Sequence, residues 1–76
     1  MKGLRTRRQR AAIAVLKQAR VDAGLTQQEL AKRIRRPQSF VSMYETGDRR
    51  VDLTEFLEIA SALNADASEL IKRMQR

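Results

Sequence analysis

Apolar residues recur along this chain at intervals of three and four, the spacing that places them on one side of an α-helix. The spacing predicts five helices, over residues 7–23, 27–34, 37–46, 53–63 and from 67 onward. Their predicted inward-facing residues are Ile13, Leu16, Ala19 and Ala23 in the first; Leu30, Ala31 and Ile34 in the second; Val41, Tyr44 and Glu45 in the third; Leu53, Phe56, Leu57, Ala60 and Leu63 in the fourth; and Leu70, Ile71 and Met74 in the fifth. No segment has the pattern of a strand, so we expect an all-α fold, a compact five-helix bundle.

Capping residues mark the starts of these helices. An N-cap Thr or Asp accepts a hydrogen bond from the first turn, and a Glu or Gln three residues later reaches back. Four such pairs precede helical segments: Thr6 with Gln9, Thr26 with Glu29, Asp52 with Glu55, and Asp66 with Glu69. Gly24 and Gly47 stand at helix ends, and Pro37 at a helix start, where proline is tolerated. Since capping accounts for these Thr, Asp and Glu residues, they need no catalytic role.

The size and composition limit what the chain does. Its 76 residues have room for one domain, which we expect over residues 7–76 after a basic arm at 1–6. The absence of Cys and His removes disulfides, thiol nucleophiles, imidazole bases and the usual zinc ligand sets. We therefore expect no enzyme activity, metal or cofactor. The longest apolar run, six residues from Ala11 to Leu16, is too short to span a membrane, and a cytoplasmic location is expected.

The charge is high and uneven. The formal net charge is +7, with an isoelectric point near 11.1. Residues 1–36 hold eleven Lys and Arg against two acids, whereas residues 37–76 hold five against seven. Such a basic half indicates a polyanionic partner. The arginines at its start are either a solvated tail or phosphate contacts: Arg5, Arg7, Arg8 and Arg10.

The third predicted helix differs from the rest of this basic chain. The stretch PQSFVSMYETG contains no Lys or Arg, and its only formal charge is Glu45. Helical periodicity places Ser39, Ser42, Met43 and Thr46 on the outward side, with Gln38 at its N-terminal edge. Solvent-facing helices normally carry Lys and Glu, so this row suggests base reading. Two short helices joined by a tight turn, with the second uncharged on its outward face, predict a helix-turn-helix over residues 26–46. Phe40, on the flank, is expected in the core or in a dimer surface.

The segment GLTQQELAKRI followed by QSFVSMYETG resembles the lambda repressor and Cro class of helix-turn-helix DNA-binding domains, also called the XRE family. The resemblance covers about residues 16–63. It implies a lambda-repressor-like bundle in which Gln27 contacts phosphate and Gln38 and Ser39 read bases. It also implies that Ser42 and Met43 face the major groove and that Thr46 lies near the sugar-phosphate backbone. A family ion pair is expected between Arg20 and Glu45.

The chain departs from the family pattern in the turn between the two helices. Relatives usually have a small or glycine-like residue, an apolar one and a Ser cap, where this chain has Arg35, Arg36 and Pro37. An Arg in a left-handed turn position costs on the order of 1 kcal/mol. Both arginines are expected to contact phosphate. Met43 replaces a residue that is often basic or polar.

Three classes of function compete for this pattern. The leading one is a sequence-specific transcription regulator that binds double-stranded DNA, as a homodimer on a pseudo-palindromic operator. Its expected dimer surface is the C-terminal helix, around Leu70, Ile71 and Met74. An antitoxin or adapter that acts mainly through protein contacts is the alternative. A cationic membrane-surface protein is disfavoured, because residues 7–23 are alanine-rich and needed for the core.

Overall fold

The computed structural model describes residues 6–75 and contains five α-helices. They are α1 (Arg7–Asp22), α2 (Gln27–Arg33), α3 (Gln38–Thr46), α4 (Leu53–Ala62) and α5 (Ala67–Met74). The described part of the chain has no strand, and the predicted all-α class is confirmed. The five predicted helices each match an observed one to within a residue or two at either end.

The predicted N-caps form in the structure. Thr6 accepts from the Gln9 backbone N–H, and the pairs Thr26 with Glu29 and Asp52 with Glu55 make full capping boxes. Asp66 caps α5 by accepting from the N–H of Ser68, at 2.9 Å, and not from that of Glu69. These caps fix where each helix begins.

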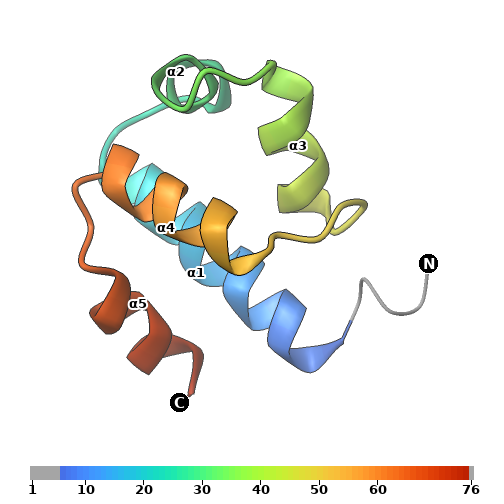
Figure 1. The fold of residues 1–76 in the computed structure, drawn as a ribbon, viewed down its shortest axis with the longest axis vertical. Helices are drawn as coiled ribbons and strands as arrows, with labels where there is room; N and C mark the ends of the chain where they lie inside the picture. Colours follow the sequence, from blue (N-terminus) through green and yellow to red (C-terminus); the bar gives the residue numbers. More distant parts are fainter. Residues whose placement is uncertain (1–5, 76) are drawn as a thin grey trace.

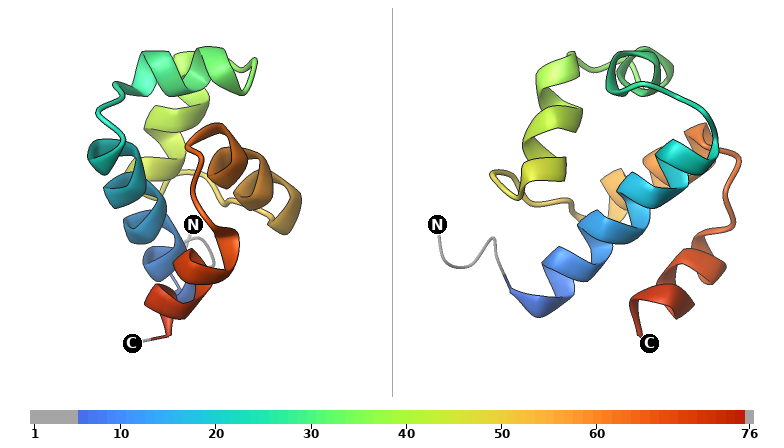
Figure 2. Two further views of the ribbon diagram at one scale, coloured as in Figure 1. Left: turned by 90° about the vertical axis from the view of Figure 1, so that its left-hand side faces the viewer. Right: turned by 180° about the vertical axis from the view of Figure 1, so that it is seen from behind.

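The helices are arranged around α1. Figure 1 shows α4 lying across α1, with α2 and α3 at one end of the molecule and α5 at the other. Helix α1 packs against α3, α4 and α5, while α2 packs mainly against α3. The rotated views in Figure 2 show the same separation of α5 from α3. The segment after α3 is tied to α1 as well, because the Gln9 side-chain amide exchanges two hydrogen bonds with the Val51 backbone.

The core is mainly aliphatic and contains three aromatic rings, those of Phe40, Tyr44 and Phe56. Its fully buried side chains are Leu16, Leu30, Val41, Tyr44 and Ile59. The ring of Phe40 is buried too, and its edge meets the Tyr44 ring with centroids 5.5 Å apart. Of the two expectations for Phe40, the structure therefore supports the core position.

Parts of the predicted core were wrong. Leu53 and Leu57 are 69% and 47% exposed, because Phe56, Ile59 and Ala60 form the buried side of α4. Ala23 is exposed, since α1 ends at Asp22 and Ala23 is its C-cap.

The prediction for α5 needs a similar correction. Leu70 is only 2% exposed and belongs to the core of its own chain, so it does not form part of an outer surface. Ile71 is exposed and Met74 is partly buried. Of the three residues expected at a dimer surface, only Ile71 and Met74 have side chains accessible to a partner.

Candidate nucleic-acid interface

The turn between α2 and α3 is compact and strained at one residue. Helix α2 ends with its cap at Ile34, followed by Arg35 with a φ of 57° in the left-handed region. The Arg36 N–H donates to the Ala31 carbonyl and the Arg35 N–H to the Lys32 carbonyl. This is the bonding of a Schellman motif with Arg where glycine is usual, at a cost on the order of 1 kcal/mol. The expected left-handed Arg is therefore present.

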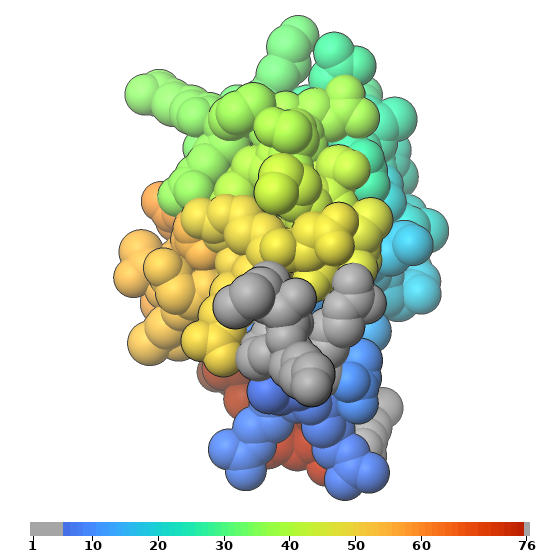
Figure 3. All heavy atoms as spheres, turned by 90° about the vertical axis from the view of Figure 1, so that its right-hand side faces the viewer, coloured from blue at the N-terminus to red at the C-terminus, as the bar shows by residue number. Residues whose placement is uncertain are grey.

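Helix α3 has two different faces. Phe40, Val41 and Tyr44 are buried, and with Glu45 they form what we term the held face. Gln38, Ser39 and Met43 are exposed on the other side, Met43 by 44%, and Ser42 beside them is half-buried. We term these four residues the reading face. Figure 3 views the molecule from the side on which α3 reaches the surface. The predicted assignment of residues to the two sides of this helix agrees with the structure.

The held face is fixed by a buried ion pair. Arg20 of α1 binds Glu45 through both carboxylate oxygens, with Nε to Oε2 at 2.7 Å and Nη2 to Oε1 at 3.1 Å. Their side chains are only 12% and 2% exposed. A third bond, from Arg20 Nη1 to the Leu25 carbonyl at 2.7 Å, holds the guanidinium at the start of α2. The hydrogen bond to Glu45 raises the pKa of Arg20 above its ordinary value, so its guanidinium stays charged.

Gln27, the expected phosphate contact, joins the same network. Its Nε2 donates to Glu45 Oε1 at 2.9 Å, an interaction that the sequence did not predict. A Gln amide carries two N–H groups, so one remains for another acceptor. The network therefore orients the Gln27 amide at the first turn of α2, where backbone N–H groups also favour an anion.

A second ionic cluster, formed by Arg36, Arg49 and Glu55, connects Phe40 of α3 to the start of α4. The guanidinium carbons of Arg36 and Arg49 lie 4.4 and 4.6 Å from the centroid of the Phe40 ring. Arg49 gives two hydrogen bonds to buried Glu55, at 3.0 and 2.9 Å, and Arg36 gives one at 3.2 Å. The Arg49 hydrogen bonds are the main cause that lowers the pKa of Glu55 to about 2. The sequence pattern predicted Glu55 only as a capping residue, although the neighbouring arginines were a signal for this cluster.

Several expected phosphate contacts have partners within the chain. Arg36 binds Glu58 at 3.3 Å as well as Glu55. The Thr46 hydroxyl oxygen lies 3.1 Å from the Met43 carbonyl oxygen and 3.0 Å from Asp48 Oδ2, so it can donate to either.

The other expected phosphate contacts lie elsewhere. Arg7 and Arg8 are exposed and line a cleft beside Ile71 and Met74. Arg5 lies outside the described residues.

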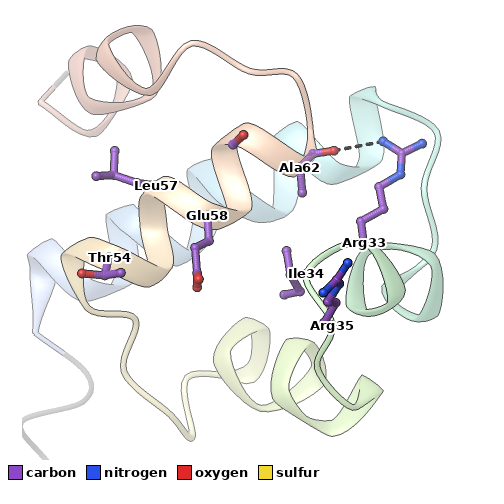
Figure 4. A pocket seen from close by; sticks show the side chains of 8 residues that line it. Arg33, Ile34, Arg35, Thr54, Leu57, Glu58 and Ala62 are labelled. Carbon is purple, nitrogen blue, oxygen red and sulfur yellow. Dashed lines mark hydrogen bonds between the residues drawn. The ribbon is translucent and has the colours of Figure 1, made fainter.

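Arg35 belongs to an open cleft of about 530 Å³ between the end of α2 and α4. Figure 4 shows Arg33 and Arg35 close together there, with Arg33 donating to the Ala62 carbonyl at 2.9 Å. Leu57 and Glu58 line the cleft from α4. Arg35 therefore lines the same cleft as residues of α4.

Two basic side chains of α1 lie next to α3. Arg10 and Lys17 line a cleft with Thr46 and Gly47, at the end of α3. From the sequence, Arg10 was grouped with the arginines at the start of the chain, and Lys17 was not predicted. Their spacing of seven residues on a predicted helix was the available signal.

Some other features of the described residues bear on the candidate chemistry. The Tyr44 hydroxyl is buried with no hydrogen-bond partner among them, and burial raises the pKa of its phenol. Residues 6–75 contain no cluster of three or more acidic, His or Cys residues that could hold a metal ion. None of the described helices is long and apolar enough to cross a membrane.

Comparisons with known proteins agree with this architecture. A helix-turn-helix family model matches residues 16–70. An XRE-family like protein from Pseudomonas syringae pv. tomato str. DC3000 has a TM-score of 0.83 and 41% identity, covering 90% of this chain and 83% of that one. The clp gene regulator ClgR from Corynebacterium glutamicum also has a TM-score of 0.83, at 26% identity, covering 90% and 88%. No curated protein sequence gives a significant match.

Proposed function

Because the chain belongs to the XRE family of helix-turn-helix proteins, we propose that it is a transcription regulator that binds double-stranded DNA in a sequence-specific way, with α3 in the major groove. The observation that carries this proposal is the contrast within α3. Its uncharged reading face is exposed, while its held face is buried and bonded to α1. A helix fixed so firmly presents its outer side chains in one orientation, as base recognition requires. The regulator ClgR among the similar structures supports the same role.

The reading face suits hydrogen bonding to base edges. A helix of nine residues is about 13 Å long, and the major groove is about 12 Å wide and admits a helix. Gln38, at the N-terminal end, has one acceptor and two donors, so it matches N6 and N7 of adenine together. Ser39 and Ser42 add short hydrogen bonds, and Met43 offers an apolar contact to a thymine methyl group. We therefore propose a half-site that contains A·T pairs.

The backbone contacts belong to the surrounding positive charge. Gln27 approaches a phosphate with its remaining N–H, and Thr46 lies at the other end of α3. Arginines of the arm, of the start of α1 and of the turn complete the proposed set: Arg5, Arg7, Arg8, Arg35 and Arg36. Arg36 has the strongest competing partners, Glu55 and Glu58, so its phosphate contact requires those ion pairs to rearrange.

We also propose that the protein acts as a homodimer. One short recognition helix contacts few base pairs, and two-fold pairing doubles the site. The proposed surface contains Ile71 and Met74 of α5 together with Leu53 of α4, three apolar side chains that line one cleft. A strictly monomeric species at tens of micromolar protein, both free and on DNA, would contradict this part of the proposal.

Selection of bound sequences from random duplex DNA tests the proposed function. We expect enrichment of one motif, repeated with two-fold symmetry and with half-sites about 10 base pairs apart, centre to centre. A protein that binds DNA without enriching any motif would contradict the proposed sequence specificity. A single unrepeated motif would contradict only the homodimer.

A further inference from the structure

We infer that α1 carries a second phosphate-binding surface, formed by Arg10 and Lys17 beside the C-terminal end of α3. This inference rests on the proposed function and extends it, because it identifies a further stretch of DNA backbone that the protein binds. The ligand is the phosphate backbone of one strand next to the half-site. We term the two residues the α1 strip.

The position of the α1 strip follows from its neighbours. Arg10, Ala14 and Lys17 line a cleft of about 320 Å³ with Glu45, Thr46 and Gly47. Thr46 is also the exposed last residue of α3, so the cleft borders the end of the recognition helix. In Figure 3 the light-blue part of α1 lies beside the yellow end of α3, on the side where α3 reaches the surface. Backbone phosphates flank the major groove, so a helix that borders α3 faces one of the strands.

The spacing of the strip fits a nucleic-acid backbone. Seven residues of helix place Arg10 and Lys17 about 10 Å apart along α1. Phosphates of one strand advance about 3.4 Å each along the duplex axis, so this distance spans about three of them. Ala14 lies between the two basic residues and is small enough for the backbone to approach the helix closely.

The charges near Lys17 leave it available to an anion. Helix α1 has no acidic residue before Asp22, and Gln18 donates to Asp22 at 2.8 Å. Lys17 is exposed and has no ion-pair partner among residues 6–75. Glu45 lines the same cleft, but its carboxylate is buried and already accepts from Arg20 and Gln27. Lys17 therefore offers a positive charge that is not paired within the described residues.

A structural role is the competing explanation. The last carbonyls of α3 carry partial negative charge, and nearby cations stabilise a helix end by about 0.3 to 1 kcal/mol. Under that explanation, loss of the strip lowers the melting temperature and leaves the salt dependence of DNA binding unchanged. Under our inference it changes the salt dependence.

The test compares two double variants that remove the same charge. Arg10→Ala with Lys17→Ala removes the α1 strip, and Lys72→Ala with Arg73→Ala removes two charges from α5, at the opposite end of the molecule from α3 (Figure 1). Dissociation constants are measured between about 50 and 200 mM salt, on a selected duplex and on a random duplex. Melting temperatures are recorded for both variants.

We expect the α1 double variant to lower the log-log salt slope on both duplexes by about 1.8 for each bound protomer, since each phosphate contact contributes about 0.9. The ratio of affinities for the two duplexes should stay the same. The α5 variant should keep the wild-type slope. A wild-type slope in the α1 variant, or an equal change in both variants, would overturn the inference.

Two further measurements keep the outcomes separate. If the double variant unfolds, Lys17→Gln alone should lower the slope by about 0.9 for each bound protomer, and Lys17→Arg should keep the wild-type slope. If wild-type protein binds both duplexes equally well, the proposed sequence specificity fails, while the slope still tests the α1 strip. If the slope does not change in a protein that discriminates between the duplexes, only the α1 strip fails.

Discussion

The two faces of α3 have opposite relations to the rest of the protein. The held face is buried against α1 and α2 and contains a carboxylate bonded by two side chains. The reading face has no hydrogen bond from its four side chains to any other described side chain. The held face sets where the helix lies, and the reading face is left accessible to solvent. Substitutions in the held face should therefore lower stability, whereas substitutions in the reading face should change DNA sequence preference.

The largest expected effect is on the held face, in Glu45→Ala. This change leaves Arg20 buried without its carboxylate and frees the Gln27 amide. Removing one partner of a buried pair typically destabilises by about 3 to 5 kcal/mol, a large part of the stability of a small domain. Urea unfolding measures it, and Glu69→Ala on the exposed side of α5 is the control. An unchanged melting temperature would show that the held face does not depend on this pair.

Acid should weaken the second cluster behind the held face. The pKa of Glu55 is about 2 in the folded protein, against an ordinary 4.5. Its stabilising effect is therefore complete above about pH 4.5 and is lost as the pH falls through about 2. Unfolding free energies at several pH values should decline less steeply over this window in Glu55→Gln than in wild type. Equal declines would mean that Glu55 does not hold Phe40 through Arg36 and Arg49.

Loss of the arginines at the start of the chain should lower the affinity for DNA without changing the preference for one DNA sequence. Replacing Arg5, Arg7 and Arg8 together by Ala should lower the salt slope by roughly one unit for each lost phosphate contact. The loss should be similar on all sequences, because phosphates carry no base identity. Binding titrations at several salt concentrations measure this slope. An unchanged slope would identify these arginines as a solvated tail.

The smallest effect on stability is expected from Tyr44→Phe. The hydroxyl of Tyr44 is buried with no hydrogen-bond partner among the described residues, so its removal should stabilise the protein by about 1 kcal/mol. The ring packing against Phe40 is kept. Thermal unfolding measures the change. A clear loss of stability would mean that the hydroxyl has a partner such as a bound water.

The sequence predicted local structure better than the packing between helices. Caps such as Thr26 and Asp52 determine where helices begin through hydrogen bonds to residues only a few positions away, so the helix starts could be predicted from the sequence. The packed face of α4 depends on the angle at which it meets α1, which is why Leu53 and Leu57 were wrongly placed inside. Clusters that join distant residues were only partly predictable. The Arg20 and Glu45 pair came from the family resemblance, whereas the bonds of Gln27 and Glu55 depend on three-dimensional proximity.

If the reading face recognises bases, Gln38→Ala should change the DNA sequence preference of the protein. Affinities of wild type and variant are measured on the selected duplex, on the same duplex with each base pair changed, and on random DNA. Gln75→Ala, an exposed glutamine after α5, is the control. We predict a loss of about 1 to 3 kcal/mol on the selected duplex, little change on random DNA, and relaxed preference at one base pair per half-site. An equal loss on every sequence would show that Gln38 contacts the backbone, and would contradict this account of α3.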